Sequence, residues 1–181
     1  CFWTELAGGA AFIGCVTRYG CGRSGVISPR GAVIFAHLGI LLVVALIDWD
    51  TQMIYDRFHI MILILAVFDF LLYPERGIMT RLIGALIISV PMLILALVIP
   101  GAFGGGDIKL MAASGLLLGT ASIVCAMFIG IVTGGGYAAV MLAGKKLEKK
   151  DQFAFGPFLA LGLAAAVFWG DQIAAWYLHF L

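Results

Sequence analysis

The sequence predicts an all-α fold, a polytopic transmembrane bundle of six or seven helices. Hydrophobic residues make up 63% of its 181 residues and charged residues only 12%, which lies outside the composition of soluble domains. The mean hydropathy is +1.11. Only helices and closed barrels satisfy the backbone in lipid, and the apolar runs are too long for barrel strands. Because one crossing takes about 20 helical residues, residues 1–181 are expected to form a single membrane-embedded domain.

Short polar, glycine-containing or proline-containing stretches separate the predicted helices. A loop with three arginines (18–30) follows the first helix, and an acidic loop (48–57) follows the second. A loop with two further arginines (76–81) separates the third helix from the fourth, which stops at Pro100. A glycine-rich stretch precedes the short fifth helix, and a lysine cluster separates the last two. The predicted helices are residues 2–16, 32–47, 58–73, 82–99, 108–118, 121–143 and 155–177.

Charge and cysteine content exclude two classes of function. The net charge of +1 provides no basic field for nucleic acid. No Cys-x-x-Cys pair occurs, and no set of His, Cys and Asp has metal-ligand spacing, so no metal site is predicted. The chain starts at Cys1 and enters an apolar run without a charged signal-peptide region. We therefore expect these residues to be the membrane part of a longer protein whose N-terminal cytoplasmic region is missing here.

Lysines fix the expected orientation of the bundle. The densest cluster lies between the last two predicted helices, and the positive-inside tendency places it in the cytoplasm. Counting crossings back from this cluster puts the loops that bear Asp48 and Asp107 on the same cytoplasmic side. The arginine-containing loops then fall on the opposite side. The lysines of the cluster are Lys145, Lys146, Lys149 and Lys150.

Two acidic clusters at the predicted cytoplasmic face are the candidate reactive groups. Asp48 and Asp50 lie at the end of the second helix, and Asp107 follows a run of glycines at the start of the fifth. Ionisable groups beside apolar runs are costly in a membrane and indicate function. Two carboxylates close together do not both ionise readily, so one keeps a proton while the other activates water. Asp48 and Asp107 are therefore the predicted catalytic pair of an aspartic protease.

Residues around this pair are candidates for binding substrate. Glycines 104–106 would let an extended substrate backbone run close to Asp107, although a flexible turn is the simpler interpretation. Asp50 and Asp56 would attract a cationic substrate segment, or would be ordinary solvated loop acids. Lys109 would pair with an acidic substrate group or extend to the membrane interface. The candidate substrate-binding residues are Gly104, Gly105, Gly106, Lys109, Asp50 and Asp56.

Several motifs, in order along nearly the whole chain, resemble type IV prepilin peptidases, the leader peptidases of type IV pilus and type II secretion systems. Thr4-Glu5-Leu6 is similar to the Val-Glu-Leu that opens a helix in that family. A lone Gly-x-Gly-Asp would be weak evidence, whereas the ordered set is specific. The other matching segments are residues 45–52 (ALIDWDTQ), 104–110 (GGGDIKL), 155–160 (FGPFLA) and 169–173 (WGDQI).

The resemblance implies that Asp48 and Asp107 are the catalytic aspartates of a peptidase domain in the bacterial inner membrane. It implies prepilin or pseudopilin substrates, cut on the cytoplasmic side after the glycine that ends a short basic leader. Proteolysis of this kind needs no cofactor. Many members also methylate the new N-terminus with S-adenosylmethionine and carry a cysteine-rich zinc region. That region is absent from this sequence, so methyltransferase activity stays open for the full-length protein.

One departure from the family pattern leaves the first catalytic acid with an alternative. The family has Ile-Pro-Asp where this chain has Ile54-Tyr55-Asp56, and the loss of proline predicts a less rigid turn. Tyr55-Asp56 also resembles the Tyr-Asp of the presenilin group, which shares Gly-x-Gly-Asp. Asp56 is therefore the second candidate for the first acid. Asp48 is favoured because its flanking residues match the prepilin peptidases and no Pro-Ala-Leu motif occurs.

A transporter or ion-conducting protein is the alternative class of function. Asp69, Asp107 and Glu5 would then line a pathway through the membrane. The clustering of acids at one face and the absence of an inverted repeat count against it. Asp69 lies inside the third apolar run, where a structural acid with a partner is favoured over a catalytic one. A structural scaffold would leave the two acidic motifs without a purpose.

Overall fold

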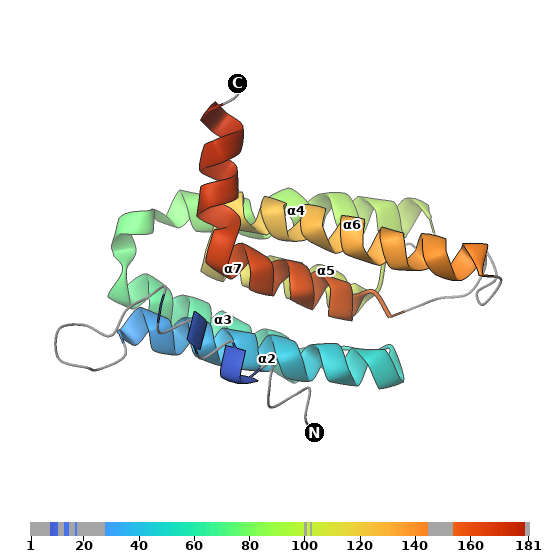
Figure 1. The fold of residues 1–181 in the computed structure, drawn as a ribbon. Coiled ribbons are helices and arrows are strands. Elements are labelled where there is room, and N and C mark those ends of the chain that lie inside the picture. Colours follow the sequence, from blue (N-terminus) through green and yellow to red (C-terminus); the bar gives the residue numbers. More distant parts are fainter. Residues whose placement is uncertain are drawn as a thin grey trace.

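The computed structural model confirms an all-α membrane bundle (Figure 1). It describes residues 8–10, 13, 14, 17, 28–99, 101, 103–144 and 154–179. Within these ranges every regular element is helical. The elements are α2 (Pro29–Thr51), α3 (Asp56–Leu72), the 3₁₀ helix η1 (Pro74–Arg76), α4 (Ile78–Val98), α5 (Gly105–Leu118), α6 (Thr120–Ala143) and α7 (Gly156–His179).

Several sequence predictions fall outside the described residues. The predicted first helix, residues 2–16, is described only at 8–10, 13 and 14, which are helical, as is Thr17. Three of the four cysteines also lie outside, as do the lysine cluster that fixed the orientation and two of the arginines on the expected far side. The residues concerned are Cys1, Glu5, Cys15, Arg18, Cys21, Arg23, Lys145, Lys146, Lys149 and Lys150.

Helix α2 is longer at both ends than the apolar run that predicts it. Its start is fixed by Ser28, whose hydroxyl accepts a hydrogen bond from the backbone N–H of Gly31 at 3.1 Å. At its other end the hydroxyl of Thr51 donates to the carbonyl of Ile47 at 2.8 Å. Gln52 then takes a left-handed conformation with φ of 52° and ends the helix. As a result, the carboxylate of Asp48 is held on a helix and not on a loop.

Three of the helices, α2, α4 and α6, are long and apolar enough to cross a membrane. Their apolar side chains are exposed to an extent that water would not favour: Leu97 on α4 is 76% exposed, and Phe128 on α6 is 70% exposed. Helix α3 is also apolar on its outer surface, where Leu71 is 70% exposed. Helix α5 has only 14 residues and is too short to span the bilayer core. Lipid is therefore the natural solvent of the outer helix surfaces.

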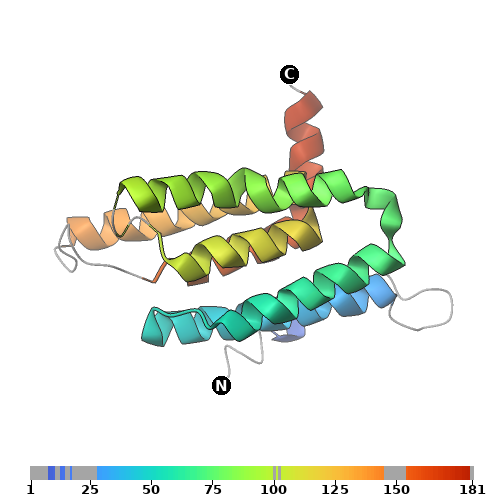
Figure 2. The same cartoon turned by 180° about the vertical axis from the view of Figure 1, so that it is seen from behind.

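Helices α2 to α6 and the first part of α7 run side by side along roughly the same direction (Figures 1 and 2). Helices α2 and α3 lie together on one side, and η1 carries the chain from α3 to α4 on the other. Helix α5 packs between α4 and α3, and the first part of α7 packs between α6 and α2. The final turns of α7 bend away from the other helices in both views. The C-terminal end of α2 and the N-terminal ends of α3, α5 and α7 consequently meet at the same end of the bundle.

A pair of glycines brings α4 and α5 into close contact. A β-carbon at Gly84 would lie 2.7 Å from the carbonyl oxygen of Gly115, and one at Gly115 would collide with the backbone of Gly84. Close approach of backbones at small residues is a common means of helix association in membranes. This contact holds the short α5 against a long helix, and so fixes the depth at which Asp107 lies.

Asp69 forms a buried ion pair at the opposite end of the bundle. Its Oδ2 accepts a hydrogen bond from the guanidinium of Arg81 at 2.7 Å, and the two side chains are 2% and 4% exposed. The same guanidinium nitrogen donates to the carbonyl of Tyr73 at 3.3 Å, and Arg30 approaches Asp69 Oδ1 to 3.9 Å. The prediction that Asp69 is an acid with a structural partner is confirmed. A transport role for Asp69 would require breaking this pair.

Replacing Asp69 with asparagine is expected to lower the free energy of unfolding by about 3–5 kcal/mol. The change leaves the buried Arg81 cation without its counter-charge, which costs that much when one partner of a buried pair is removed. Unfolding in mixed detergent, followed by circular dichroism, measures it. Glu75→Gln, an exposed acid at the same end, is the control and should stay within about 0.5 kcal/mol of the parent. Equal stability of Asp69→Asn and the control would contradict a structural role.

Candidate active site

Asp48 is a buried carboxylate in the last turn of α2. Its side chain faces the bundle, and the residue is 5% exposed. Its Oδ2 accepts a hydrogen bond from the backbone N–H of Gly156 at 3.0 Å. Gly156 is the first residue of α7, so the carboxylate lies at a helix N-terminus, where the helix dipole favours negative charge. The backbone of α7 therefore fixes the position of the Asp48 carboxylate.

The packing of Asp48 explains why residue 156 is a glycine. A β-carbon there would lie 2.6 Å from Oδ2 of Asp48 and 2.8 Å from its Cγ. No side chain fits at that distance without moving the carboxylate. From the sequence alone, residues 155–160 stand out only as a motif. The structure gives Gly156 a physical role: it supports the carboxylate of Asp48 from a helix more than one hundred residues further along the chain.

Asp107 is the second buried carboxylate and lies in the first turn of α5. The residue is 7% exposed, and its Oδ2 accepts a hydrogen bond from the backbone N–H of Gly104 at 3.3 Å. The carboxylate thus caps its own helix. Its Oδ1 is buried and has no hydrogen-bond partner among the described residues. An ionised oxygen in that situation is costly, whereas a protonated one can serve as a donor.

The two carboxylates influence each other electrostatically. Burial, reinforced by the negative charge of Asp48, raises the pKa of Asp107 to about 7. Asp107 therefore keeps a proton at pH values where an ordinary aspartate is ionised. Asp48 differs from Asp107 in that it accepts its hydrogen bond from the N-terminus of another helix, α7. The arrangement can supply a general acid and a general base from two aspartates at one end of the bundle.

The sequence of this chain matches one known protein family over more than half its length. The model of the type IV leader peptidase family aligns with residues 35–139, a range that contains both Asp48 and Asp107. The chain belongs to the type IV leader peptidase family. The resemblance noted from the sequence motifs is thereby confirmed, and the fold found here is that of a family member.

Curated relatives agree with this assignment of family. The chain is 31% identical over 147 residues to the prepilin leader peptidase/N-methyltransferase of Bacillus subtilis (strain 168), which covers 81% of this chain and 58% of that protein. It is 30% identical over 172 residues to the protein of the same name from Stutzerimonas stutzeri, with coverages of 92% and 59%. The chain thus spans somewhat over half the length of these relatives. No solved structure matches it.

Asp56, the alternative first acid of this leader peptidase family member, makes a different contact. It is the first residue of α3 and forms an ion pair with Lys109 at 2.7 Å, with side chains 69% and 58% exposed. The hydrogen bond and positive charge of Lys109 lower the pKa of Asp56. The pKa of Asp107, by contrast, is raised first by burial and then by the negative charge of Asp48. Lys109 and Asp56 are thus paired with each other within the chain, and Asp48 stays the predicted first acid. Asp50, two residues after Asp48, is exposed.

The tyrosine that replaces the family's proline keeps the backbone that proline would impose. Tyr55 has φ of −73° and ψ of 138° and immediately precedes α3. A proline fixes φ near −65°, within the range of this value. The turn between α2 and α3 therefore has, at this residue, a backbone conformation that proline would also adopt. Ile54 in this turn lies under Gly106, where a β-carbon would approach its Cβ to 2.9 Å.

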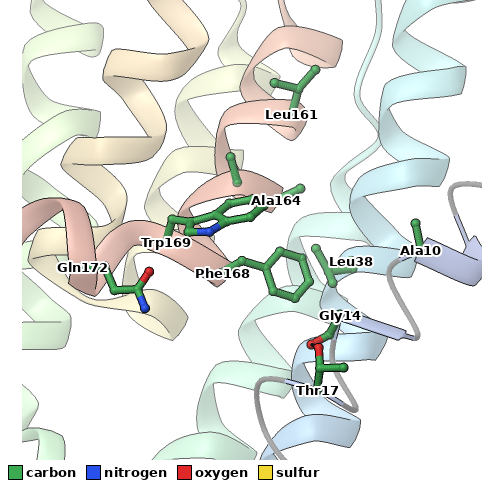
Figure 3. A pocket seen from close by; sticks show the side chains of 10 residues that line it. Ala10, Gly14, Thr17, Leu38, Leu161, Ala164, Phe168, Trp169 and Gln172 are labelled. Carbon is green, nitrogen blue, oxygen red and sulfur yellow. Dashed lines mark hydrogen bonds between the residues drawn. The ribbon is translucent and has the colours of Figure 1, made fainter.

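Two features of the described residues bear on a metal ion and on S-adenosylmethionine. No three His, Cys, Asp or Glu side chains there come together as metal ligands. A cavity of about 600 Å³ lies beside Phe168 and Trp169 of α7 (Figure 3). Its walls are apolar apart from Thr17, Gln172 and the Trp169 indole. Ribose hydroxyls are commonly bound by a carboxylate, and this cavity has none in its lining. The cavity does not fit the cofactor that the relatives' N-methyltransferase name implies.

The rate of leader cleavage is expected to fall as the pH rises through about 7. Asp107 must be protonated to act as an acid, and its raised pKa of about 7 means that the proton is lost above this value. The profile of kcat/KM between about pH 5 and about pH 9 measures this. A rate that is level across the range would contradict the role of Asp107 as the protonated partner.

Replacing Gly105 with alanine distinguishes the two interpretations of the glycine run. A β-carbon at this position meets no atom within 4 Å, so the fold should tolerate it. If a substrate backbone passes here, kcat/KM should fall by about tenfold, at the low end of what one added methyl group changes in a binding site. Thermal unfolding should be unchanged. An unaltered KM and kcat would show that Gly105 serves only the turn.

Proposed function

We propose that this protein is an aspartic endopeptidase that removes the short basic leader of prepilins or pseudopilins, for assembly of a type IV pilus or a type II secretion system. The observation that carries the proposal is the pair of buried carboxylates, Asp48 from α2 and Asp107 from α5, at one end of the bundle. Membership of the leader peptidase family supports the choice of reaction. The names of the relatives support the choice of substrate.

The proposed mechanism uses the two aspartates in different protonation states. Asp107, whose pKa is raised to about 7, donates its proton to the oxygen of the scissile carbonyl. Asp48, supported by the Gly156 N–H, takes a proton from a water molecule whose oxygen attacks the carbonyl carbon. The tetrahedral diol then collapses as the C–N bond breaks and the proton on Asp48 passes to the leaving amine. A hydroxyl proton of the diol returns to Asp107 as the new carboxyl group forms.

The location of the pair suits a substrate that is itself inserted in the membrane. The site lies at the end of the bundle that the lysine cluster assigns to the cytoplasm, in a bacterial inner membrane. The exposed Asp50 lies two residues after Asp48, where it would attract the basic leader. Gly104, Gly105 and Gly106 would let the segment around the scissile bond approach Asp107. The whole of residues 1–181 would act as a single peptidase domain.

Leader cleavage is the activity proposed for these residues, and it needs no cofactor. The relatives' name adds N-methyltransferase activity, which would use S-adenosylmethionine on the new N-terminal amine. The cavity beside Trp169 does not fit that cofactor. The proposal for these residues therefore covers cleavage and does not include methylation by the full-length protein. No partner other than the prepilin or pseudopilin and the surrounding lipid is proposed, and nucleic acid is not among them.

Cleavage of a purified prepilin with its leader intact tests the proposal. The full-length protein in detergent should release the leader after its terminal glycine, as read by mass spectrometry of the mature N-terminus. A variant prepilin with that glycine replaced by a bulky residue is the control and should remain uncut. Persistence of the intact prepilin with folded protein would contradict the proposal. Ion or solute flux in proteoliposomes without any proteolysis would support the transport alternative instead.

A further inference from the structure

The glycine run before Asp107 is held to α3 by a buried histidine. His59 lies in the first turns of α3 and is 5% exposed. Its Nε2 is 3.0 Å from the carbonyl oxygen of Gly106, the residue directly before Asp107. A carbonyl only accepts, so Nε2 must carry the hydrogen and donate it. The contact joins two segments of the chain that are distant in sequence, at the position where the backbone leads into the catalytic carboxylate.

A second contact between the same helices lies on the other side of Asp107. Lys109, two residues further along α5, forms its ion pair with Asp56 of α3 at 2.7 Å. The Nδ1 of His59 lies 3.5 Å from Oδ1 of the same Asp56. The charged and titratable groups that face His59 are thus Asp56 from α3 and Lys109 from α5. Together these contacts attach the first turn of α5 to the start of α3 on both sides of Asp107.

The two contacts differ in how firmly they hold. Lys109 and Asp56 are more than half exposed, and exposed ion pairs are weakened by water and salt and contribute little. The His59 side chain is 6% exposed, so its bond to Gly106 is shielded from competition with water. Asp107 itself has only the N–H of Gly104 on its Oδ2, and its Oδ1 has no partner among the described residues. The backbone therefore supplies most of the restraint on where this carboxylate sits.

We propose that His59 is a positioning residue for the catalytic pair: by holding the Gly106 carbonyl, it fixes the first turn of α5 and with it the position of Asp107. The expected effect on the rate of leader cleavage rests on the proposed function. The expected structural effect, reduced mobility of residues 104–109, does not depend on that function. His59 does not touch the reacting atoms. It acts through the backbone of Gly106.

Substitution of His59 tests the positioning role. In His59→Leu the donor is lost while a buried apolar side chain of similar volume remains. Leader cleavage should lose about 100-fold in kcat, the effect of roughly an ångström of misplacement, with little change in KM. His59→Gln places an amide N–H where Nε2 stood and should recover most of the loss. Hydrogen exchange of residues 104–109 should be faster in His59→Leu and close to the parent in His59→Gln.

The chain offers a matched control in His37. This buried histidine lies on α2, about 16 Å along the helix axis from Asp48 at 1.5 Å per residue. Among the described residues, neither of its ring nitrogens has a hydrogen-bond partner. His37→Leu should leave kcat and the exchange of residues 104–109 unchanged. Parental kcat and exchange in His59→Leu would overturn the inference, as would failure of His59→Gln to recover either. Because exchange is measured without substrate, the inference can fail or hold independently of the proposed function.

Discussion

Replacing either Asp48 or Asp107 with asparagine is expected to reduce leader cleavage by on the order of 10³-fold or more, because each variant removes one partner of the proton transfer. Asparagine has nearly the same shape as aspartate. At position 48 its amide oxygen can still accept the hydrogen bond from Gly156, so the fold should persist. Cleavage of a purified prepilin by the parent and the two variants, at equal amounts of folded protein, measures the effect.

Asp56→Asn is the comparison that separates the two candidates for the first acid. Its exposed pair with Lys109 contributes little, so this variant should lose less than about tenfold. If Asp48→Asn kept the activity of the parent while Asp56→Asn abolished it, the first catalytic acid would move to Asp56 and the pair described here would be wrong.

Replacing Gly156 with alanine is expected to cost about 100-fold in kcat although residue 156 supplies no side chain to the reaction. The added β-carbon would lie 2.6 Å from Oδ2 of Asp48, so either the carboxylate or the start of α7 must move. A displacement of about an ångström in a catalytic group has an effect of this size. The rate of leader cleavage at saturating prepilin measures it, with circular dichroism to show that the bundle is intact.

A glycine on α6 provides the control for this substitution. A β-carbon at Gly135 meets no atom within 4 Å, and alanine is favoured over glycine in a helix by up to about 1 kcal/mol. Gly135→Ala should therefore cleave at the parental rate and unfold no more easily. Parental activity in Gly156→Ala would mean that the contact with Asp48 does not position the carboxylate.

The general fold was predictable because lipid leaves few choices. Apolar runs of sufficient length must be helices, and their number follows from the polar stretches between them. The ends of helices were less predictable. Hydropathy stops at residue 47, but α2 continues to Thr51 because a hydroxyl bond to Ile47 and the left-handed Gln52 form its end. This extra turn carries Asp48, so the placement of the carboxylate on a helix required the structure.

The candidate site, like the fold, could be predicted from the sequence only in part. Asp48 and Asp107 could be found from sequence because carboxylates beside apolar runs are rare and their flanking motifs are specific. Gly156 and His59 could not be given their roles, since both act through atoms far away along the chain: an N–H to Asp48 in one case and a backbone carbonyl before Asp107 in the other. Asp69 was expected to have a structural partner, but only the structure, in which η1 leads from the end of α3 to the start of α4, identifies Arg81 as that partner.

Catalysis by a pair of aspartates is tested most directly by the cleavage rate of the double variant Asp48→Asn, Asp107→Asn beside the two single variants. Residues that act as a unit have strongly non-additive effects, because loss of one already removes the function of the other. The double variant should therefore cleave prepilin no more slowly than the worse single variant. A double variant slower by the product of the two single effects would contradict catalysis by a coupled pair, as would substantial cleavage by either folded single variant.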